Sequence, residues 1–132
     1  MKRAHGQMSE SLLLGALLAM AGGFFDAYTY LCRGKVFANA QTGNIVLFGA
    51  NIAEGNWLRA AEYLLPILAF ALGVVAAEIV KRRYKKRQSD INIHWRQIVV
   101  LVEIVLLIAA AFLPQTLNTT VNIMISFICA MQ

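Results

Sequence analysis

Long apolar runs alternate with polar or charged breaks along the chain. The runs cover residues 11–32, 63–81, 97–114 and 119–132. A transmembrane helix needs about 20 mostly apolar residues, and the last run stops after only about 13. The pattern predicts an all-α fold, a polytopic helical membrane protein with about four full or partial spans.

Residues 1–10 are predicted to form an N-terminal tail, and residues 11–132 a single transmembrane helical domain. The first run is longer than the apolar core of a signal peptide, which holds about 7–15 residues, so we expect it to be retained. Because the run at 119–132 has no polar stop, we expect a truncated span and a chain that is a fragment of a longer protein.

A further hydrophobic stretch, residues 36–53, is interrupted by polar side chains. Unsatisfied polar groups cost several kcal/mol each in hydrocarbon, so this segment must face protein or water. We expect a broken or re-entrant segment, with irregular backbone through 38–43 and a half-helix of about nine residues starting near Asn44. The alternative is a continuous polar helix whose amides bond to neighbouring helices. The polar and glycine positions are Asn39, Gln41, Thr42, Gly43, Asn44 and Asn51.

Composition supports a membrane protein and argues against a nucleic-acid partner. Hydrophobic residues make up 59% of the chain, charged residues only 14%, and the mean hydropathy is +0.61. The net charge of +5 is concentrated in the loop 81–96, so it forms a local patch rather than a binding face. Positively charged loops stay cytoplasmic, and such a loop attracts anionic lipid. Its first basic residues are Lys81, Arg82, Arg83, Lys85, Lys86 and Arg87.

The charge rule does not place the N-terminus. If residues 36–53 span the membrane, the N-terminus lies outside, and if they re-enter, it lies inside. Both arrangements leave the same number of basic residues on each side.

Asp26 lies late in the first run, where a charge is costly and needs a partner. Gly15, Ala19 and Gly23 recur every four residues and predict a face where another helix approaches closely. Since Asp26 follows Gly23 by three residues, we expect its side chain to point into the bundle.

Three kinds of partner are open to Asp26: the amides of Asn39, Gln41 and Asn44, the N-terminus of the half-helix, or a bound cation or proton. The carboxylate is then either a coordinating or protonatable site or a structural group that holds two helices in register.

Two other acids lie in apolar runs. Glu103 is roughly 9 Å into its run, where it either accepts a proton or reaches the interface to pair with a basic residue. Glu78 precedes Lys81 by three residues and Arg82 by four, a spacing that predicts local ion pairs. Nearby, the spacing of Ala69, Gly73 and Ala77 predicts a second packing face.

Catalytic and metal-binding patterns are missing from the sequence. It holds no nucleophile motif, phosphate loop or paired catalytic carboxylates. Cys32 and Cys129 lack metal-ligand spacing, and His5 and His94 have no companion ligands. We expect neither an enzyme, a cofactor nor a metal site.

The two motifs AGGFFDAYTYL and VFANAQTGNIVLFG resemble the YoaK-type family of bacterial multi-pass membrane proteins, whose function is unassigned. The matching positions are Ala21, Gly22 or Gly23, Asp26, Ala27, Val36, Phe37, Ala38, Asn39, Thr42, Gly43, Asn44 and Gly49. The resemblance implies about six spans in a longer chain with a second copy of the motif pair. FICAMQ, residues 127–132, looks like the start of that copy, and the second Thr-Gly-Asn is missing.

The favoured function is transport or channelling of a small solute across the cytoplasmic membrane of a bacterium. In the candidate binding site Asp26 supplies charge, Thr42, Asn44 and Asn39 supply polar contacts, and Gly43 exposes backbone. The expected partners are the lipid bilayer and either a second copy of the chain or the missing C-terminal half. The alternative is a non-transporting scaffold or accessory subunit, in which the amides and Asp26 satisfy one another.

Overall fold

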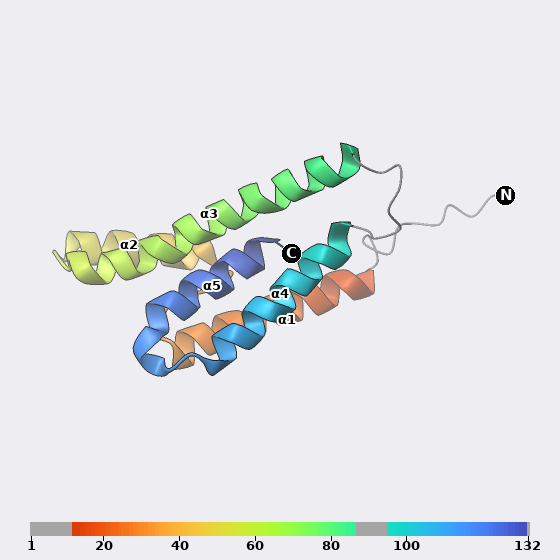
Figure 1. Cartoon of the computed structure of the whole chain (residues 1–132). Helices are drawn as coiled ribbons and strands as arrows, with labels where there is room; N and C mark the ends of the chain where they lie inside the picture. Colours follow the sequence, from red (N-terminus) through yellow and green to blue (C-terminus); the bar gives the residue numbers. More distant parts are fainter. Residues whose placement is uncertain (1–11, 87–94, 132) are drawn as a thin grey trace.

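The computed structural model describes residues 12–86 and 95–131, and every regular element within them is helical. The predicted all-α class is therefore confirmed. In chain order the elements are α1 (Leu12–Cys32), α2 (Gln41–Ala53), α3 (Trp57–Lys86), α4 (Trp95–Phe112), the 3-10 helix η2 (Gln115–Leu117) and α5 (Asn118–Met131) (Figure 1).

α3 is longer than the apolar run that predicted it. It begins at Trp57 rather than near residue 63 and continues through Lys86, so the first part of the predicted basic loop is helical. Within it, Glu78 Oε1 accepts a hydrogen bond from Arg82 Nε at 2.9 Å, and Glu78 Oε2 lies 3.7 Å from Lys81 Nζ. These two ion pairs confirm the predicted local pairing. Arg87 and the rest of the loop to residue 94 lie outside the described residues.

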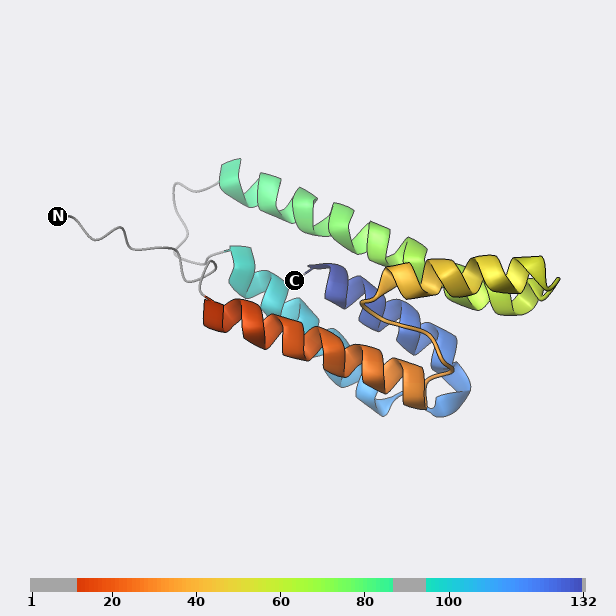
Figure 2. The ribbon, with the colours of Figure 1, turned by 180° about the vertical axis from the view of Figure 1, so that it is seen from behind.

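The segment between α1 and α2 doubles back along the bundle, so α2 starts well inside the length of the bundle (Figure 2). Gly34 and Lys35 reverse the chain after α1 with φ angles of +94° and +66°, a backbone region that favours glycine. α2 then extends past the end of α1, and Gly55, with φ of +77°, turns the chain back into α3.

The half-helix differs from the predicted one in start and length. α2 has 13 residues and begins at Gln41 rather than near Asn44. Its N-cap is Ala40, whose methyl side chain cannot cap the helix, and Asp26 Oδ1 accepts hydrogen bonds from the main-chain N–H groups of Asn39 and Ala40 just before the first helical residue. At 1.5 Å per residue α2 is about 20 Å long, less than the hydrocarbon core of about 30 Å.

The arrangement of the helix ends favours the re-entrant alternative for residues 36–53. The start of α1, the end of α3 and the start of α4 lie at one end of the bundle (Figures 1 and 2). The α2–α3 turn and the α4–α5 connection lie toward the other end, and α5 ends inside the bundle. The chain thus reaches the second end with α1, turns part of the way back, and returns there with α2.

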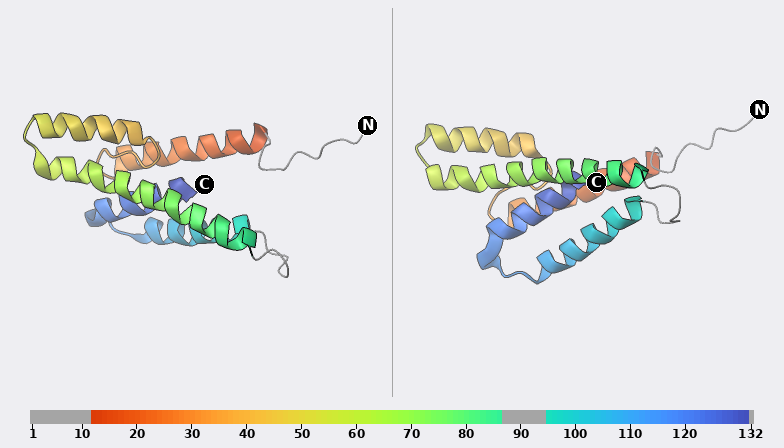
Figure 3. Two further views of the ribbon diagram at one scale, coloured as in Figure 1. Left: turned by 90° about the horizontal axis from the view of Figure 1, so that it is seen from above. Right: turned by 45° about the horizontal axis from the view of Figure 1, so that its top comes forward.

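The interface between α3 and α5 is built around Gly73. A Cβ atom on Gly73 would lie 2.5 Å from the carbonyl oxygen of Phe127 and 2.7 Å from the Cβ of Ala130. Ala69, one turn earlier on α3, is also buried. The predicted packing face of α3 is therefore confirmed at Ala69 and Gly73, because only small residues allow this approach. Figure 3 shows α5 passing beneath the middle of α3 while α2 pairs with its first half.

The predicted packing face of α1 meets no other helix among the described residues. A Cβ atom on Gly15 or Gly23 would meet nothing within 4 Å, and both glycines are exposed, as is Ala19. The closely packed glycine of α1 is instead Gly22, where a Cβ atom would lie 2.6 Å from Asn39 Nδ2. The close contacts of α1 lie on another face: the connection to α2 packs at Gly22, and Phe25 and Tyr28 pack against the buried cluster that includes Ala110 of α4 and Val121 of α5.

Large apolar side chains face outward, and polar side chains occupy much of the interior. The outward-facing apolar residues include Leu17, Met20 and Phe24 on α1, Leu68, Leu72 and Val75 on α3, and Leu101, Val105 and Ile108 on α4. The buried polar residues are Thr29, Arg33, Asn44, Glu103, Asn122 and Ser126. By length and composition, one helix among the described residues is long and apolar enough to cross a membrane, at Trp57–Arg83, and Val100–Phe112 is a shorter apolar helix.

Candidate functional site

Asn44 is fully buried and binds the connection that precedes its own helix. Its Oδ1 accepts a hydrogen bond from the main-chain N–H of Phe37 at 2.9 Å. Its Nδ2 donates to the carbonyl of Phe37 at 2.6 Å and to Gln41 Oε1 at 2.9 Å. Gln41 in turn donates to the carbonyl of Ala38 at 2.7 Å. The two amides therefore replace the backbone bonding that an irregular segment lacks.

Asp26 lies at the start of α2, which is one of the three arrangements that the sequence left open. Its Oδ1 accepts hydrogen bonds from the main-chain N–H groups of Asn39 at 2.7 Å and Ala40 at 3.1 Å. Asp26 is half-buried. A carboxylate that accepts two main-chain N–H groups at a helix start gains both charge-assisted bonds and the favourable end of the helix dipole.

The remaining residues of the predicted site lie near this point in different roles. The side chains of Asn39 and Thr42 are exposed. Gly43 packs against an aromatic ring, since a Cβ atom there would lie 2.8 Å from Phe37 Cδ2. The ring of Phe37 also stacks on Tyr30 with 4.7 Å between centroids. Gly43 thus makes room for a ring and does not offer bare backbone to a ligand.

Glu103 is buried midway along α4, deeper than its place in the apolar run indicated. The thiol of Cys129 on α5 is also buried and lies within electrostatic range of the carboxylates of Asp26 and Glu103. Within the described residues, no group of three or more His, Cys, Asp or Glu side chains is placed to hold a metal ion.

Arg33, directly after α1, is a buried charge that the sequence did not single out. It is 5% exposed. Its Nε donates to the hydroxyl of Tyr28 at 2.7 Å, and its terminal nitrogens donate to the carbonyls of Pro114 at 3.2 Å and Leu113 at 3.1 Å. Its own carbonyl accepts a bond from Asn122 Nδ2 at 2.8 Å. The arginine therefore fastens the end of α1 to the α4–α5 connection.

One face of α5 carries polar atoms without hydrogen-bond partners. Asn118, Asn122 and Ser126 recur every four residues and so share a face of the helix. Their Oδ1, Oδ1 and Oγ atoms are buried and have no partner in the described residues. The same spacing is present in the sequence, but spacing alone does not show whether the polar atoms find partners.

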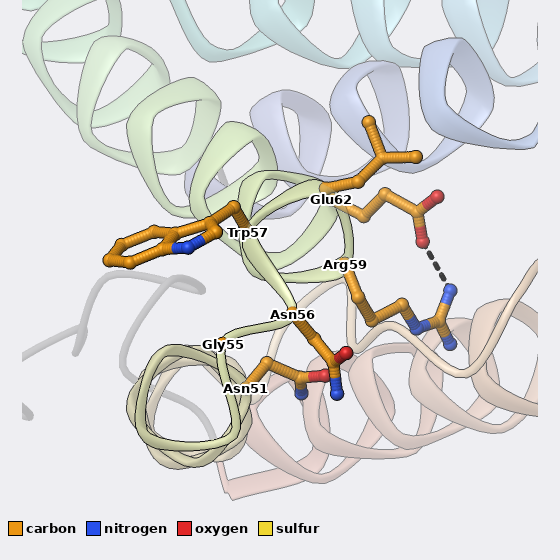
Figure 4. A pocket seen from close by; sticks show the side chains of 7 residues that line it. Asn51, Gly55, Asn56, Trp57, Arg59 and Glu62 are labelled. Atoms are coloured by element: carbon orange, nitrogen blue, oxygen red, sulfur yellow. Dashed lines mark hydrogen bonds and ion pairs between the residues drawn. The ribbon is translucent and has the colours of Figure 1, made fainter.

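Two hollows that share the lining residues Arg59 and Glu62 lie near the end of this face. The larger, of about 620 Å³, is open and lies at the α2–α3 turn; its lining residues include Asn51, Asn56, Trp57, Arg59 and Glu62 (Figure 4). The smaller, of about 100 Å³, lies deeper; its lining residues include Arg33, Arg59, Glu62, Asn118 and Asn122. The ion pair of Arg59 with Glu62 borders both hollows.

Arg59 holds its place through three neighbours. It forms the ion pair with Glu62, donates a hydrogen bond to the carbonyl of Gly34 at 2.7 Å, and lies over the ring of Tyr63 at 5.2 Å from the centroid. Figure 4 shows the Arg59–Glu62 pair on one side of the hollow and Trp57 pointing to the other.

Comparison with known proteins assigns the chain to a family. Residues 14–132 match the model of the family described as "Protein of unknown function (DUF1275)", so the chain belongs to that family. Over 65 residues it is 34% identical to the UPF0700 transmembrane protein YoaK of Bacillus subtilis (strain 168). The match covers 49% of this chain and 29% of that relative. It confirms the resemblance to the YoaK-type family. No solved structure matches the chain.

Proposed function

We propose that the chain is a multi-pass protein of the bacterial cytoplasmic membrane, crossed by α1, α3 and α4 and entered by α2. The outward-facing apolar side chains of these helices and the buried polar residues support this, because a water-soluble protein places them the other way round. The transmembrane relative supports it as well.

The bundle end that carries Lys81, Arg82 and Arg83 is proposed to be cytoplasmic. All three side chains are exposed at the end of α3, where basic residues keep a loop inside the cell and attract anionic lipid. Since α1 starts at the same end of the bundle, its start is proposed to be cytoplasmic too, and the end of α1 and the α2–α3 turn are proposed to lie toward the outer surface.

Within this membrane protein we propose a path for a small polar solute along the inner face of α5. The observation that carries the proposal is the row of unpartnered atoms, Asn118 Oδ1, Asn122 Oδ1 and Ser126 Oγ. A buried polar atom without a partner costs about 1–3 kcal/mol. Water or a polar solute that moves along the row satisfies these atoms in turn.

The two hollows give the path an entrance. The open hollow at the α2–α3 turn and the small cavity beside Asn118 and Asn122 share the Arg59–Glu62 pair in their linings, and we propose that the solute passes from one to the other at this pair. Deeper along α5 lie Ser126 and Cys129, the second of which is in range of Asp26 and Glu103. A second copy of this chain, or the further helices of a longer one, is proposed to form the opposite wall.

A second candidate, a non-transporting scaffold or accessory subunit, is favoured by the saturation of Asn44. Its amide group makes three hydrogen bonds, all within the connection and α2. Asp26 likewise accepts from the main chain at the start of α2. These residues hold the re-entrant segment in shape, which is what a scaffold requires.

Solute uptake by proteoliposomes separates the two functions. The purified 132-residue chain would be reconstituted, and swelling followed by light scattering after mixing with glycerol, urea or glycolate. We expect faster swelling than in empty liposomes, and its loss in Asn118→Leu. The matched control is Thr120→Leu, because Thr120 is exposed two residues further along α5. Wild-type swelling no faster than that of empty liposomes, or equal swelling in both variants, would overturn transport and leave the scaffold.

A further inference from the structure

Arg33 is a buried cation whose bonds all go to neutral oxygens. Its three hydrogen bonds end on a tyrosine hydroxyl and two carbonyls, and among residues 12–86 and 95–131 it forms no ion pair. It also lies over the ring of Tyr28, 5.5 Å from the centroid. A buried charge without a counter-charge carries a desolvation penalty of several kcal/mol. The position therefore favours the approach of an anion.

The small cavity places that anion beside Arg33. Its volume of about 100 Å³ corresponds to roughly three water molecules, enough for a solute of a few non-hydrogen atoms. Two arginines, Arg33 and Arg59, are among its lining residues. Glu62 also lines it, but its carboxylate is paired with Arg59. The lining is therefore positive overall, by the charge of Arg33.

The two asparagines of the lining require the opposite kind of group. The Oδ1 atoms of Asn118 and Asn122 are buried acceptors without a partner, and Asn122 Nδ2 is already bonded to the carbonyl of Arg33. Because an amide oxygen accepts hydrogen bonds, the missing partner must donate them. A simple anion satisfies the arginine and leaves the asparagines unsatisfied, whereas a neutral polyol does the reverse.

We propose that this cavity binds a small carboxylate that also carries a hydroxyl or ammonium group. The carboxylate faces Arg33, where a guanidinium can donate two parallel hydrogen bonds, and the hydroxyl or ammonium group donates to Asn118 and Asn122. The inference rests on the proposed path along α5, to which it adds the class of solute. The Arg59–Glu62 pair stands at the mouth of the site.

Calorimetric titration of the purified full chain in detergent micelles tests the ligand class. Four probes are compared. Glycolate and glycine present a carboxylate together with a hydroxyl or ammonium group, acetate presents only the carboxylate, and ethylene glycol presents only hydroxyls. We expect glycolate or glycine to bind about tenfold more tightly than acetate or ethylene glycol, since each lost group leaves a buried partner unsatisfied. Acetate binding as tightly as both, or no binding of glycolate and glycine, would overturn the proposal.

Asn118→Asp tests the role of the counter-charge in a side chain of nearly the same shape. The new carboxylate neutralises Arg33 from within the lining, so we expect about a tenfold loss of glycolate affinity together with a higher Tm. The control is Arg82→Gln, which removes an exposed arginine at the other end of α3 and leaves binding unchanged. Wild-type affinity in Asn118→Asp would overturn the proposal.

We expect Arg33→Gln, if the variant folds, to lose glycolate affinity by the same factor as Asn118→Asp. If it does not fold, the affinity of Asn118→Asp alone tests the proposal.

The binding experiment and the uptake experiment test different claims, so one can fail without the other. If the wild-type chain carries glycolate but its affinity is indifferent to Arg33 and Asn118, the binding site is wrong and transport stands. If the chain binds glycolate and does not carry it, transport is wrong and the site stands.

Discussion

The connection before α2 and the inner face of α5 are both rich in polar side chains, but they use them in opposite ways. In the connection, Asn44 bonds the N–H and carbonyl of Phe37, and Asp26 bonds the N–H groups of Asn39 and Ala40. On α5, the buried oxygens of Asn118, Asn122 and Ser126 have no partner. We call the connection the saturated region, because the polar side chains of Asn44 and Asp26 have hydrogen-bond partners, and the inner face of α5 the unsaturated region, because these three oxygens have none.

The difference reflects what each region must hold. The connection has irregular backbone, whose N–H and carbonyl groups need partners that a helix would have supplied, so its side chains are consumed in supplying them. α5 is a regular helix with its backbone already bonded, so its buried side-chain oxygens are not needed for backbone bonding, although Asn122 Nδ2 bonds the carbonyl of Arg33. In a membrane interior such spare capacity attracts water or a polar solute. Buried polar residues in a membrane protein therefore indicate a binding site only after the hydrogen bonds that they already make within the fold have been counted.

The sharpest test of this comparison is Asn44→Leu. The substitution leaves the N–H and carbonyl of Phe37 buried without partners, so we expect the free energy of unfolding to fall by about 4 kcal/mol. Thermal or denaturant unfolding in detergent micelles, followed by circular dichroism, measures it. Thr42→Ala, an exposed change in the same helix turn, serves as control. A loss in Asn44→Leu no greater than in the control would show that the connection does not depend on this amide.

The position of the unsaturated face depends on Gly73. In Gly73→Ala the new methyl group would meet the backbone oxygen of Phe127, so α5 must move away from α3, at a cost of about 2–3 kcal/mol. The same exchange at Gly23, which faces open space, is expected to be neutral or stabilising by up to about 1 kcal/mol. Equal midpoints of unfolding for the two variants would contradict the close contact.

Two substitutions at Asp26 distinguish the contribution of its charge from that of its acceptor oxygen in the saturated region. Asp26→Ala removes the acceptor of two main-chain N–H groups, and we expect a loss of about 2 kcal/mol. Asp26→Asn keeps an acceptor oxygen and is expected to lose only about 1 kcal/mol. Both variants that fold should keep the uptake of the wild-type chain, because the carboxylate already serves the backbone. Loss of uptake in a stably folded Asp26→Asn would place Asp26 on the solute path and remove the distinction between the two regions.

Much of the saturated region could be predicted from the sequence. An interrupted apolar segment with Gln41, Thr42, Gly43 and Asn44 indicated irregular backbone followed by a short helix, and its N-terminus was one expected partner of Asp26. The helix boundary was missed by three residues because the group that holds the chain at this point is remote in sequence. Thr42 and Asn44 have the chemistry of N-caps, but the chain just before α2 is held instead by Asp26 of α1, which accepts from the N–H groups of Asn39 and Ala40.

The unsaturated region was not predicted, for a reason that lies in tertiary packing. Whether Asn118 and Ser126 are satisfied depends on which groups α3 and the end of α1 bring to them, and the spacing along α5 does not contain this information. The role of Arg33 also depends on tertiary structure, because the carbonyls of Leu113 and Pro114 that accept its hydrogen bonds are about 80 residues away along the chain. The predicted packing face at Gly15 and Gly23 shows the same limit of spacing. Spacing defines a face of a helix, but it does not say which element packs on that face.

Ser126→Ala has the smallest expected effect on stability and the opposite sign. Ser126 is 0% exposed and its hydroxyl has no partner, so removing the oxygen relieves a buried unsatisfied group and leaves almost no cavity. We expect the free energy of unfolding to stay the same or rise by about 0.5 kcal/mol, while uptake of glycolate slows because one polar step of the path is lost. Thr29→Ala is the matched control, since Thr29 is equally buried but its hydroxyl lies 2.9 Å from the carbonyl of Phe25, and its removal should not slow uptake. If Ser126→Ala instead destabilises the chain as much as Asp26→Ala does, its hydroxyl has a partner after all, and the two polar regions are of one kind.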